Sequence, residues 1–545
     1  MSSTSLPPLT ARLRGRFGPQ RLAAWLVARA TAPATSVWVV IGFAAVHAVL
    51  WTAILTNLKA AQDIHMDVAE AYAWGSRFLL GYGKHPPLSG WIAGLWFTVF
   101  PVKDWATYAL AMAMASSGLV VVWFASLKVV DRRRAFFVLV MVALYPIFNF
   151  KGFKYNADLV QLLTLPLVVL AYLHAFEKRS VASGVWLGLA GAAAMMTKYW
   201  VLTMIGAIGL AALLHPDRLR FLASPAPWVA IATMLVAMIP HLVWLWQVDF
   251  VPLTYAGDVY SLSDRGRAAG LVLGYVGHNA ALLALPIALA AAVLAWPPRF
   301  AFHNWRRGPH PGVNVSQAIN VWLVQAIVAD RGPNRIYSRR PAPPLGGLAF
   351  TIYMKTDWGI SLFFLVPLAL VAIPALRLRA VMLPRLTAVW LVLSLLTLFA
   401  SPWIAQREMA ANPNGATGYG ARSELARELT KAWHARFGSP WPLVAGFSEM
   451  NTPMTFYSPD HPRPFTVPYT AEETWSSGLS TLDDLKREGF IGICDTTDNR
   501  IAACDAWMAK EAPKAESLVM TTQRFFHGQA GPAIVWKVYI QAPAR

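Results

Sequence analysis

Long apolar runs recur along most of this chain and constrain its fold more than any other feature. They measure roughly 16 to 25 residues, close to the ~20 residues that an α-helix needs to cross a bilayer. Only 14% of the 545 residues are charged, whereas soluble globular chains average about 25%. The pattern predicts an all-α polytopic membrane protein with about eleven transmembrane helices. The expected spans are 37–56, 105–130, 135–150, 159–176, 183–197, 200–214, 226–246, 270–296, 314–329, 358–376 and 384–401.

Two segments near the N-terminus are expected to lie outside the spans. The apolar stretch 88–101 is bounded by prolines and is too short to cross comfortably, so it is interpreted as an interfacial helix. Residues 1–36 are rich in arginine and precede an apolar run that is long enough to span. A cleavable signal would have a shorter apolar core, followed closely by small residues. We therefore expect an uncleaved first helix and a cytoplasmic N-terminus.

The net charge of +19 is concentrated between the apolar runs. Residues 402–545 hold 14 Lys/Arg and 15 Asp/Glu, so the whole positive excess precedes them. This distribution argues against nucleic-acid binding and suits cytoplasmic loops and sites that face phosphates. The rule that positive loops stay inside places residues 57–104, 151–158, 247–269 and the C-terminal part outside. One loop disagrees with this scheme, and it carries Arg331, Arg335, Arg339 and Arg340.

The composition changes at about residue 402, where balanced charge replaces the apolar runs. A helix-like stretch at 421–437 and strand candidates at 442–447, 490–494 and 533–540 predict a small soluble α/β domain, 402–545. Cys494 and Cys504 are the only cysteines of the chain. In an oxidising compartment they can form a disulfide, but two unrelated thiols stay open as the alternative. Their spacing does not match a zinc site.

Polar residues of the types that serve catalysis and ligand binding gather in the segments that this topology places outside. Charged groups near the hydrocarbon region are costly and mark functional sites. His65, His241 and His278 are instead interpreted as structural or interfacial histidines. The candidate clusters are Asp67, Glu70, Lys84 and His85; Lys151, Lys154, Tyr155, Asn156 and Asp158; Thr197, Lys198, Tyr199 and Trp200; Tyr255, Asp258, Tyr260 and Arg265; and Lys355, Thr356, Asp357 and Trp358.

Such a set suits the transfer of a group away from a phosphate. A carboxylate such as Asp67 or Asp158 can accept a proton from an alcohol or amine nucleophile. Lysine and histidine side chains can neutralise a phosphate as it leaves. Each cluster also has a plainer interpretation, as solvated charges, as a helix anchor or as lipid contacts. A lone lysine between apolar runs is costly unless it is paired, so Lys198 is the strongest single indication. The inference depends on the clusters meeting on one face.

The motifs resemble those of the bacterial members of glycosyltransferase family 39, membrane enzymes of the GT-C class. The resemblance is carried over residues 37–250 by an Asp-x-x-Glu segment, a lysine shortly before Pro-Pro-Leu, a Tyr-Asn-Ala-Asp loop and a Thr-Lys-Tyr turn. It implies a GT-C fold with a transmembrane catalytic module at 37–401. It also implies that Asp67 acts as base or orients the acceptor, that Asp158 is the acidic residue of the second loop, and that Lys84 faces the donor phosphate. In protein mannosyltransferases the first-loop acids are adjacent, whereas here Val68 and Ala69 separate Asp67 from Glu70, which leaves the role of Glu70 open.

The resemblance implies an inverting transfer of a monosaccharide from a polyprenyl-phosphate donor, on the periplasmic side of a bacterial inner membrane. The expected acceptor is an envelope glycolipid, a lipopolysaccharide or a polysaccharide. Lys84, His85, Lys154 and Lys198 are expected to bind the donor phosphate, and Asp67, Asp158 and Glu70 to serve catalysis. No metal site is expected, although a divalent cation stays open because carboxylates can bind one. A flippase for lipid-linked sugars and an oligosaccharide ligase or polymerase are the alternatives.

Overall fold

The computed structural model describes residues 19–253, 262, 264–295, 363–374, 376–412, 417–467 and 479–544. Several expectations lie outside these residues and are not addressed by the structure. They are the span at 314–329, the start of the span at 358–376, the loop with Arg331, Arg335, Arg339 and Arg340, the residues Tyr255, Asp258 and Tyr260, and the segment Lys355, Thr356, Asp357 and Trp358.

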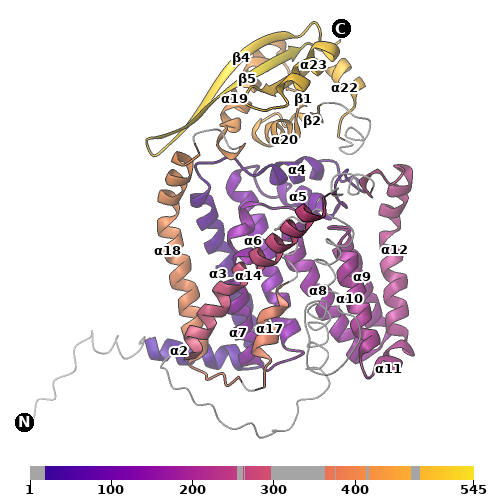
Figure 1. Ribbon diagram of the computed structural model, residues 1–545, viewed down its shortest axis with the longest axis vertical. Helices are drawn as coiled ribbons and strands as arrows, with labels where there is room; N and C mark the ends of the chain where they lie inside the picture. Colours follow the sequence, from indigo (N-terminus) through magenta and orange to yellow (C-terminus); the bar gives the residue numbers. More distant parts are fainter. Residues whose placement is uncertain are drawn as a thin grey trace, which may run out of the picture.

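The membrane part is a bundle of apolar helices (Figure 1). Among the described residues, six helices are long and apolar enough to cross a membrane, and each overlaps an expected span. Three further apolar helices are shorter: α5 (Leu88–Phe97), α9 (Val181–Met195) and α10 (Val201–Leu214). The number of about eleven spans stays a prediction. The six long helices are α3 (Ser36–Leu58), α6 (Asp104–Ser126), α8 (Ala157–Lys178), α12 (Pro225–Gln247), α14 (Arg265–Ala295) and α18 (Met382–Ala410).

The expected span at 135–150 is broken in the structure. Helix α7 (Arg132–Ala143) ends early, and the chain bends by 74° into two short 3-10 turns within Pro146–Phe153. The cause is Pro146, which has no N–H to donate and disfavours helical backbone at the residue before it. Tyr145 is accordingly extended, with ψ of 121°. The break leaves Lys151 and Lys154 in a connection at the end of the bundle.

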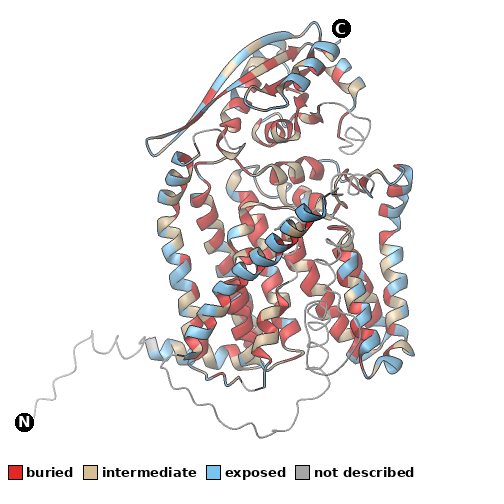
Figure 2. Cartoon of the chain, in the orientation of Figure 1, coloured by how far each residue is buried: buried red, intermediate tan, exposed pale blue. Residues whose placement is uncertain are grey.

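The bundle is apolar both inside and on its outer surface. Figure 2 shows buried residues along the centre and exposed residues on the outer helices. The outward side chains include Trp38, which is 72% exposed, and Phe399, which is 80% exposed. Apolar groups in these positions suit contact with lipid. Helices α6 and α8 approach closely at Gly118, where a Cβ would lie only 2.1 Å from the Leu162 carbonyl oxygen.

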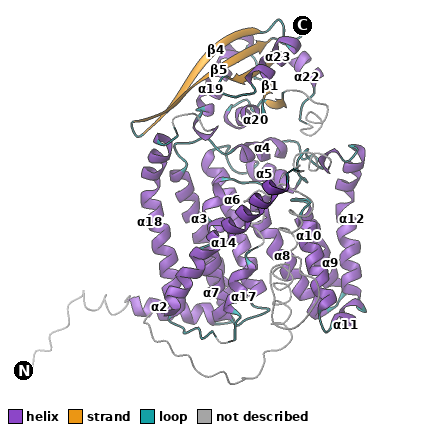
Figure 3. Cartoon of the chain, in the orientation of Figure 1, coloured by secondary structure: helices purple, strands orange, loops and turns teal. Residues whose placement is uncertain are grey.

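A five-stranded mixed sheet with helices forms the C-terminal unit (Figure 3). Its strand order is β2-β1-β3-β5-β4, in which β2, β1 and β3 are parallel while β5 is antiparallel to β3 and β4. Strands β1, β3 and β5 lie where the sequence predicts strands, but β2 and β4 were missed. Cys494 and Cys504 form a disulfide. The elements are α19 (Arg422–Phe437), β1 (Leu443–Gly446), α20 (Ser448–Tyr457), β2 (Arg463–Thr466), α22 (Leu482–Glu488), β3 (Phe490–Asp495), α23 (Ile501–Glu511), β4 (Glu516–Phe526) and β5 (Gln529–Gln541).

The C-terminal unit covers one end of the bundle (Figure 1). Two short helices, α4 (Met66–Gly75) and α5 (Leu88–Phe97), lie between the unit and the long helices. At the other end lie α2 (Pro19–Thr31), α11 (Arg218–Leu222) and α17 (Leu365–Val371). Helix α18 continues through Pro402, so the expected domain limit at 401 falls inside a helix. The domain limits stay predictions, as does the side of the membrane on which each end lies.

Candidate active site

Helix α4 carries the first two candidate acids. It begins after His65, whose Nδ1 accepts a hydrogen bond from the Asp67 backbone N–H at 3.1 Å. Side chains three residues apart on a helix are neighbours, so Asp67 and Glu70 lie on adjoining parts of its surface. Each acid has its own lysine: Asp67 Oδ2 lies 3.3 Å from Lys154 Nζ, and Glu70 Oε1 lies 2.7 Å from Lys84 Nζ. Glu70, whose role the sequence left open, is therefore the acid that binds Lys84.

Asn156 joins helix α4 to helix α8. Its side-chain oxygen accepts the backbone N–H groups of Asp158 and Leu159, at 3.0 and 3.3 Å, and so caps α8. Its amide nitrogen donates to Asp67 Oδ2 at 2.9 Å. Asparagine is a preferred residue at this cap because its oxygen satisfies N–H groups that the helix leaves free. One side chain therefore fixes both the start of α8 and the Asp67 carboxylate.

A third ion pair connects α8 with the break between α9 and α10. Lys198 Nζ donates to both carboxylate oxygens of Asp158, at 2.8 and 2.9 Å. The break is held by Thr197, whose hydroxyl donates to the Ala194 carbonyl at 2.6 Å and accepts from the Gln161 amide at 3.1 Å. Lys198 is only 8% exposed, so its charge needs this carboxylate. The expected pairing of a lone lysine between apolar runs is confirmed.

The turn with Lys84 and His85 rests on aromatic residues. Trp74 and Tyr82 stack with ring centroids 4.8 Å apart, and the Tyr82 hydroxyl donates to the Trp74 carbonyl at 2.7 Å. The turn then continues into α5, whose first N–H, on Leu88, donates to the Met196 carbonyl at 3.0 Å. The turn thereby contacts α4 through Lys84 and the α9–α10 break through Leu88.

Burial and neighbouring charges set the protonation of this cluster. Burial raises the pKa of Asp67, but Lys154, His65 and Asn156 outweigh it and hold that pKa well below its usual range. Burial raises the pKa of Glu70 above its usual range, although Lys84 opposes the rise. Burial, followed by the charges of Lys198 and Lys84, lowers the pKa of His85 to about 3. His85 is therefore a neutral hydrogen-bonding group at neutral pH rather than a cation.

The structure brings together all seven residues that the sequence singled out for the site. Asp67, Glu70 and Asp158 each pair with one lysine, and His85 lies within electrostatic reach of Lys84, Lys198 and Asp67. His65 belongs to the cluster as well, although the sequence marked it only as structural. Its position directly before a helix that starts with an acid was the available signal. In the described part of the chain, no three His, Cys, Asp or Glu side chains gather closely enough to hold a metal ion.

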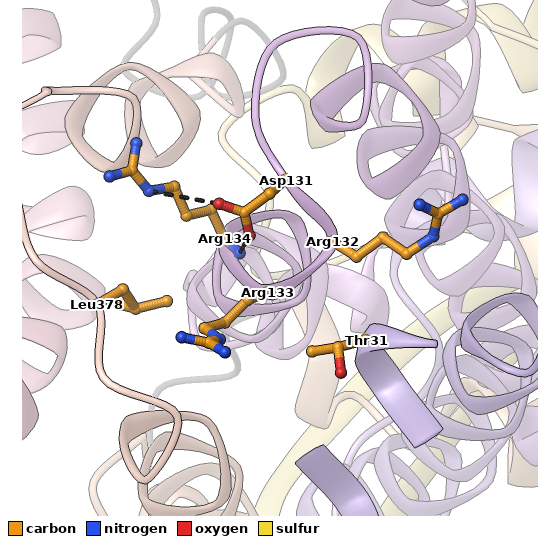
Figure 4. Close-up of a pocket in the computed structure, with 6 residues that line it drawn as sticks. All are labelled: Thr31, Asp131, Arg132, Arg133, Arg134 and Leu378. Carbon is orange, nitrogen blue, oxygen red and sulfur yellow. Dashed lines mark hydrogen bonds and ion pairs between the residues drawn. The ribbon is translucent and has the colours of Figure 1, made fainter. Parts of the chain in front are cut away.

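A cavity of about 540 Å³ lies at the opposite end of the bundle (Figure 4). Arg134 Nε lies 3.8 Å from Asp131, whereas the guanidinium groups of Arg132 and Arg133 point in different directions in Figure 4. These cations do not converge on one point, and the cavity is remote from α4. The cavity is lined by Thr31, Asp131, Arg132, Arg133, Arg134 and Leu378.

The helical bundle, the paired charges at its end and the sheet unit above them together define a multi-pass membrane protein with a GT-C type fold. The fold is similar to the crystal structure of ArnT from Cupriavidus metallidurans bound to undecaprenyl phosphate. The TM-score is 0.52 at 16% identity, over 91% of this chain and 98% of that chain.

Residues 84–244 match the family described as dolichyl-phosphate-mannose-protein mannosyltransferase. The chain is also 26% identical, over 247 residues, to the lipid A galacturonosyltransferase RgtD of Rhizobium johnstonii. That match covers 43% of this chain and 48% of the relative, so the chain spans about half the length of the curated relative that it matches. The resemblance to glycosyltransferase family 39 is confirmed. The matched family segment contains Lys84, His85, Lys154, Asp158 and Lys198 but begins after α4.

Proposed function

We propose that this chain is an inverting membrane glycosyltransferase that moves one sugar from a polyprenyl-phosphate donor to an envelope glycolipid. The observation that carries the proposal is the set of three carboxylate–lysine pairs at one end of the bundle, formed by Asp67, Glu70 and Asp158. The undecaprenyl phosphate bound to ArnT supports a polyprenyl-phosphate donor, and the lipid A substrate in the name of RgtD supports a lipid A or lipopolysaccharide acceptor. The periplasmic face of a bacterial inner membrane is the proposed location.

The transfer needs one base and several cations. The acceptor oxygen forms a bond to the anomeric carbon of the sugar while the bond from that carbon to the phosphate oxygen breaks. The acceptor proton goes to the Asp67 carboxylate, and the electron pair of the broken bond stays on the phosphate. A phosphodiester donor carries one negative charge, and the released polyprenyl phosphate approaches two. Lys84, Lys154 and Lys198 therefore stabilise charge that develops during the reaction, and neutral His85 donates a hydrogen bond.

The pair of Asp67 with Lys154 gives the donor a second role. While Lys154 lies 3.3 Å from Asp67, the acid is a weak base because its pKa is held low. A donor phosphate that binds Lys154 weakens this hold and raises the pKa of Asp67. The base then becomes effective when the donor is in place, which limits wasteful reaction with water. Asp158 orients Lys198 through two hydrogen bonds.

The proposal is tested with purified protein in liposomes, a radiolabelled polyprenyl-phosphate sugar and lipopolysaccharide from cells that lack the modification. Transfer of label to the lipid acceptor supports the proposal. Movement of labelled donor between leaflets without transfer would establish the flippase alternative. Transfer of whole oligosaccharides in preference to a monosaccharide would establish the ligase alternative. Addition of EDTA to the same assay decides whether a divalent cation is required.

A further inference from the structure

Asp63 connects the loop before α4 to the C-terminal unit. Its side chain is fully buried, at 0% exposure, and lies 3.6 Å from the Arg422 guanidinium. A second guanidinium, that of Arg524, donates to Asp63 Oδ1. A buried carboxylate is costly unless it is both paired and hydrogen-bonded. Asp63 meets this requirement entirely with groups that lie more than three hundred residues further along the chain.

Asp63 also caps a helix of the C-terminal unit. Helix α19 begins at Arg422, and the preceding residue, Ala421, has a positive φ of 51° and no side chain that can cap. Asp63 accepts the backbone N–H groups of Arg422 at 2.9 Å and Ser423 at 3.4 Å. A carboxylate in this position satisfies free N–H groups and interacts favourably with the helix dipole. The loop before α4 therefore supplies a cap that α19 itself lacks.

The C-terminal unit also contacts the loop before α4 and α4 itself. The Tyr457 hydroxyl accepts the Ile64 backbone N–H at 2.7 Å and lies 3.4 Å from Asp104 Oδ2. On α4 itself, Tyr72 packs edge-on against Phe456 and His461, with ring centroids 5.4 and 5.6 Å away. Asp63 and Ile64 lie three to four positions before Asp67. The backbone that leads into the acids is therefore held from the C-terminal unit and not from the bundle alone.

We propose that Asp63 is a positioning residue, through which the C-terminal unit fixes the start of α4 and hence the placement of Asp67 and Glu70. This inference rests on the proposed transfer function and adds a role for the C-terminal unit in it. A misplacement of about 1 Å can cost roughly a hundredfold in rate. Loss of the Asp63 contacts is expected to act on the rate of the chemical step, because the lysines that bind the donor phosphate lie on other segments.

The test compares Asp63→Asn with a variant that destabilises the C-terminal unit at a site away from Asp63. The comparison variant is Cys494→Ser/Cys504→Ser, which removes the disulfide between β3 and α23 and leaves the Asp63 contacts intact. We expect Asp63→Asn to lower kcat at least tenfold while the Kd for polyprenyl phosphate changes less than twofold. At temperatures below its Tm, the double cysteine variant is expected to keep kcat within twofold of wild type. This holds even if its Tm falls as far as that of Asp63→Asn.

Two results would overturn the inference. One is an Asp63→Asn protein with kcat within twofold of wild type, and the other is a cysteine variant whose kcat falls in parallel with its Tm. Tyr457→Phe provides a milder variant in case Asp63→Asn does not fold. It removes the hydroxyl that accepts the Ile64 N–H and donates to Asp104. We expect it to lower kcat severalfold at unchanged Kd, and an unchanged kcat would count against the inference. A wild-type protein that transfers no sugar would instead refute the proposed function.

Discussion

Lys198 donates to both oxygens of Asp158, at 2.8 and 2.9 Å, and so joins the break between α9 and α10 to the first turn of α8. Both side chains are largely shielded, with 10% and 19% exposure. Removal of one partner from such a pair leaves a charge without compensation, whereas removal of both leaves none. The pair therefore contributes to the fold and to the proposed site at the same time, and these two contributions can be separated.

Single and double variants separate the two contributions. Lys198→Met and Asp158→Asn are each expected to lower the free energy of unfolding by about 3 kcal/mol, and the double variant is expected to recover most of this loss. All three are expected to lose transfer activity, because none has a Lys198 charge in its proper place. Thermal unfolding in detergent and the transfer assay measure the two effects. Lys128→Met breaks the more exposed pair with Glu177 and serves as control, with an expected change below about 1 kcal/mol.

The pH dependence distinguishes the two acids of α4. A base must be deprotonated in the free enzyme for kcat/KM to be maximal. The pKa of Asp67 is held below its usual range, so we expect kcat/KM to stay flat from about pH 7 down to about pH 5. His85, with a pKa near 3, adds no titration in this window. If activity falls with a pKa above the usual range of glutamate, and Glu70→Gln abolishes that fall, Glu70 is the base instead.

Lys84 and Lys154 are expected to hold the donor phosphate. Lys84→Gln and Lys154→Gln each remove a charged hydrogen-bond donor, which contributes about 1.5–3 kcal/mol. Each is expected to weaken the binding of polyprenyl phosphate about 10- to 100-fold, measured by titration in detergent. Lys151→Gln changes the loop that carries Lys154 without removing a proposed ligand. Its Kd for polyprenyl phosphate is therefore expected to match wild type. Equal losses in all three variants would indicate a general electrostatic effect rather than direct contacts.

The disulfide between Cys494 and Cys504 closes a short loop, with a sequence separation of 10. Loss of a crosslink of this size is expected to destabilise the C-terminal unit by about 2–3 kcal/mol. The measurement is the unfolding transition before and after reduction, with the double serine variant as a match for the reduced protein. A transition that does not shift on reduction would show that this disulfide contributes little to stability.

Periodicity and composition predicted much of the fold. The six long spans follow from apolar length alone, and α19 and β3 follow from patterns within the C-terminal part. The kink after α7 was missed, although Pro146 was visible, because the apolar run continues past it. Strand β4 was missed because most of its residues are not buried and its sequence does not alternate clearly between apolar and polar residues.

The site could be predicted as a set of residues but not as a set of contacts. Polar groups at the ends of apolar runs identified Asp67, Glu70, Asp158 and the lysines. Which acid binds which lysine depends on how α4 lies across the bundle, and local sequence does not encode that. Asp63 is the clearest example, because its partners Arg422 and Arg524 come from a part of the chain with no local relation to it. Such contacts form only when distant segments pack together.

The role of Asp67 as the base is tested by the rate of sugar transfer of Asp67→Asn, compared with wild type in the same liposomes. Asparagine keeps the size of the side chain but cannot accept the acceptor proton. We expect a loss of about 10²- to 10⁴-fold in kcat, with a Kd for polyprenyl phosphate no higher than that of wild type, because the Asp67 carboxylate no longer competes with the phosphate for Lys154. An Asp67→Asn protein that transfers sugar as fast as wild type would contradict the assignment of this site.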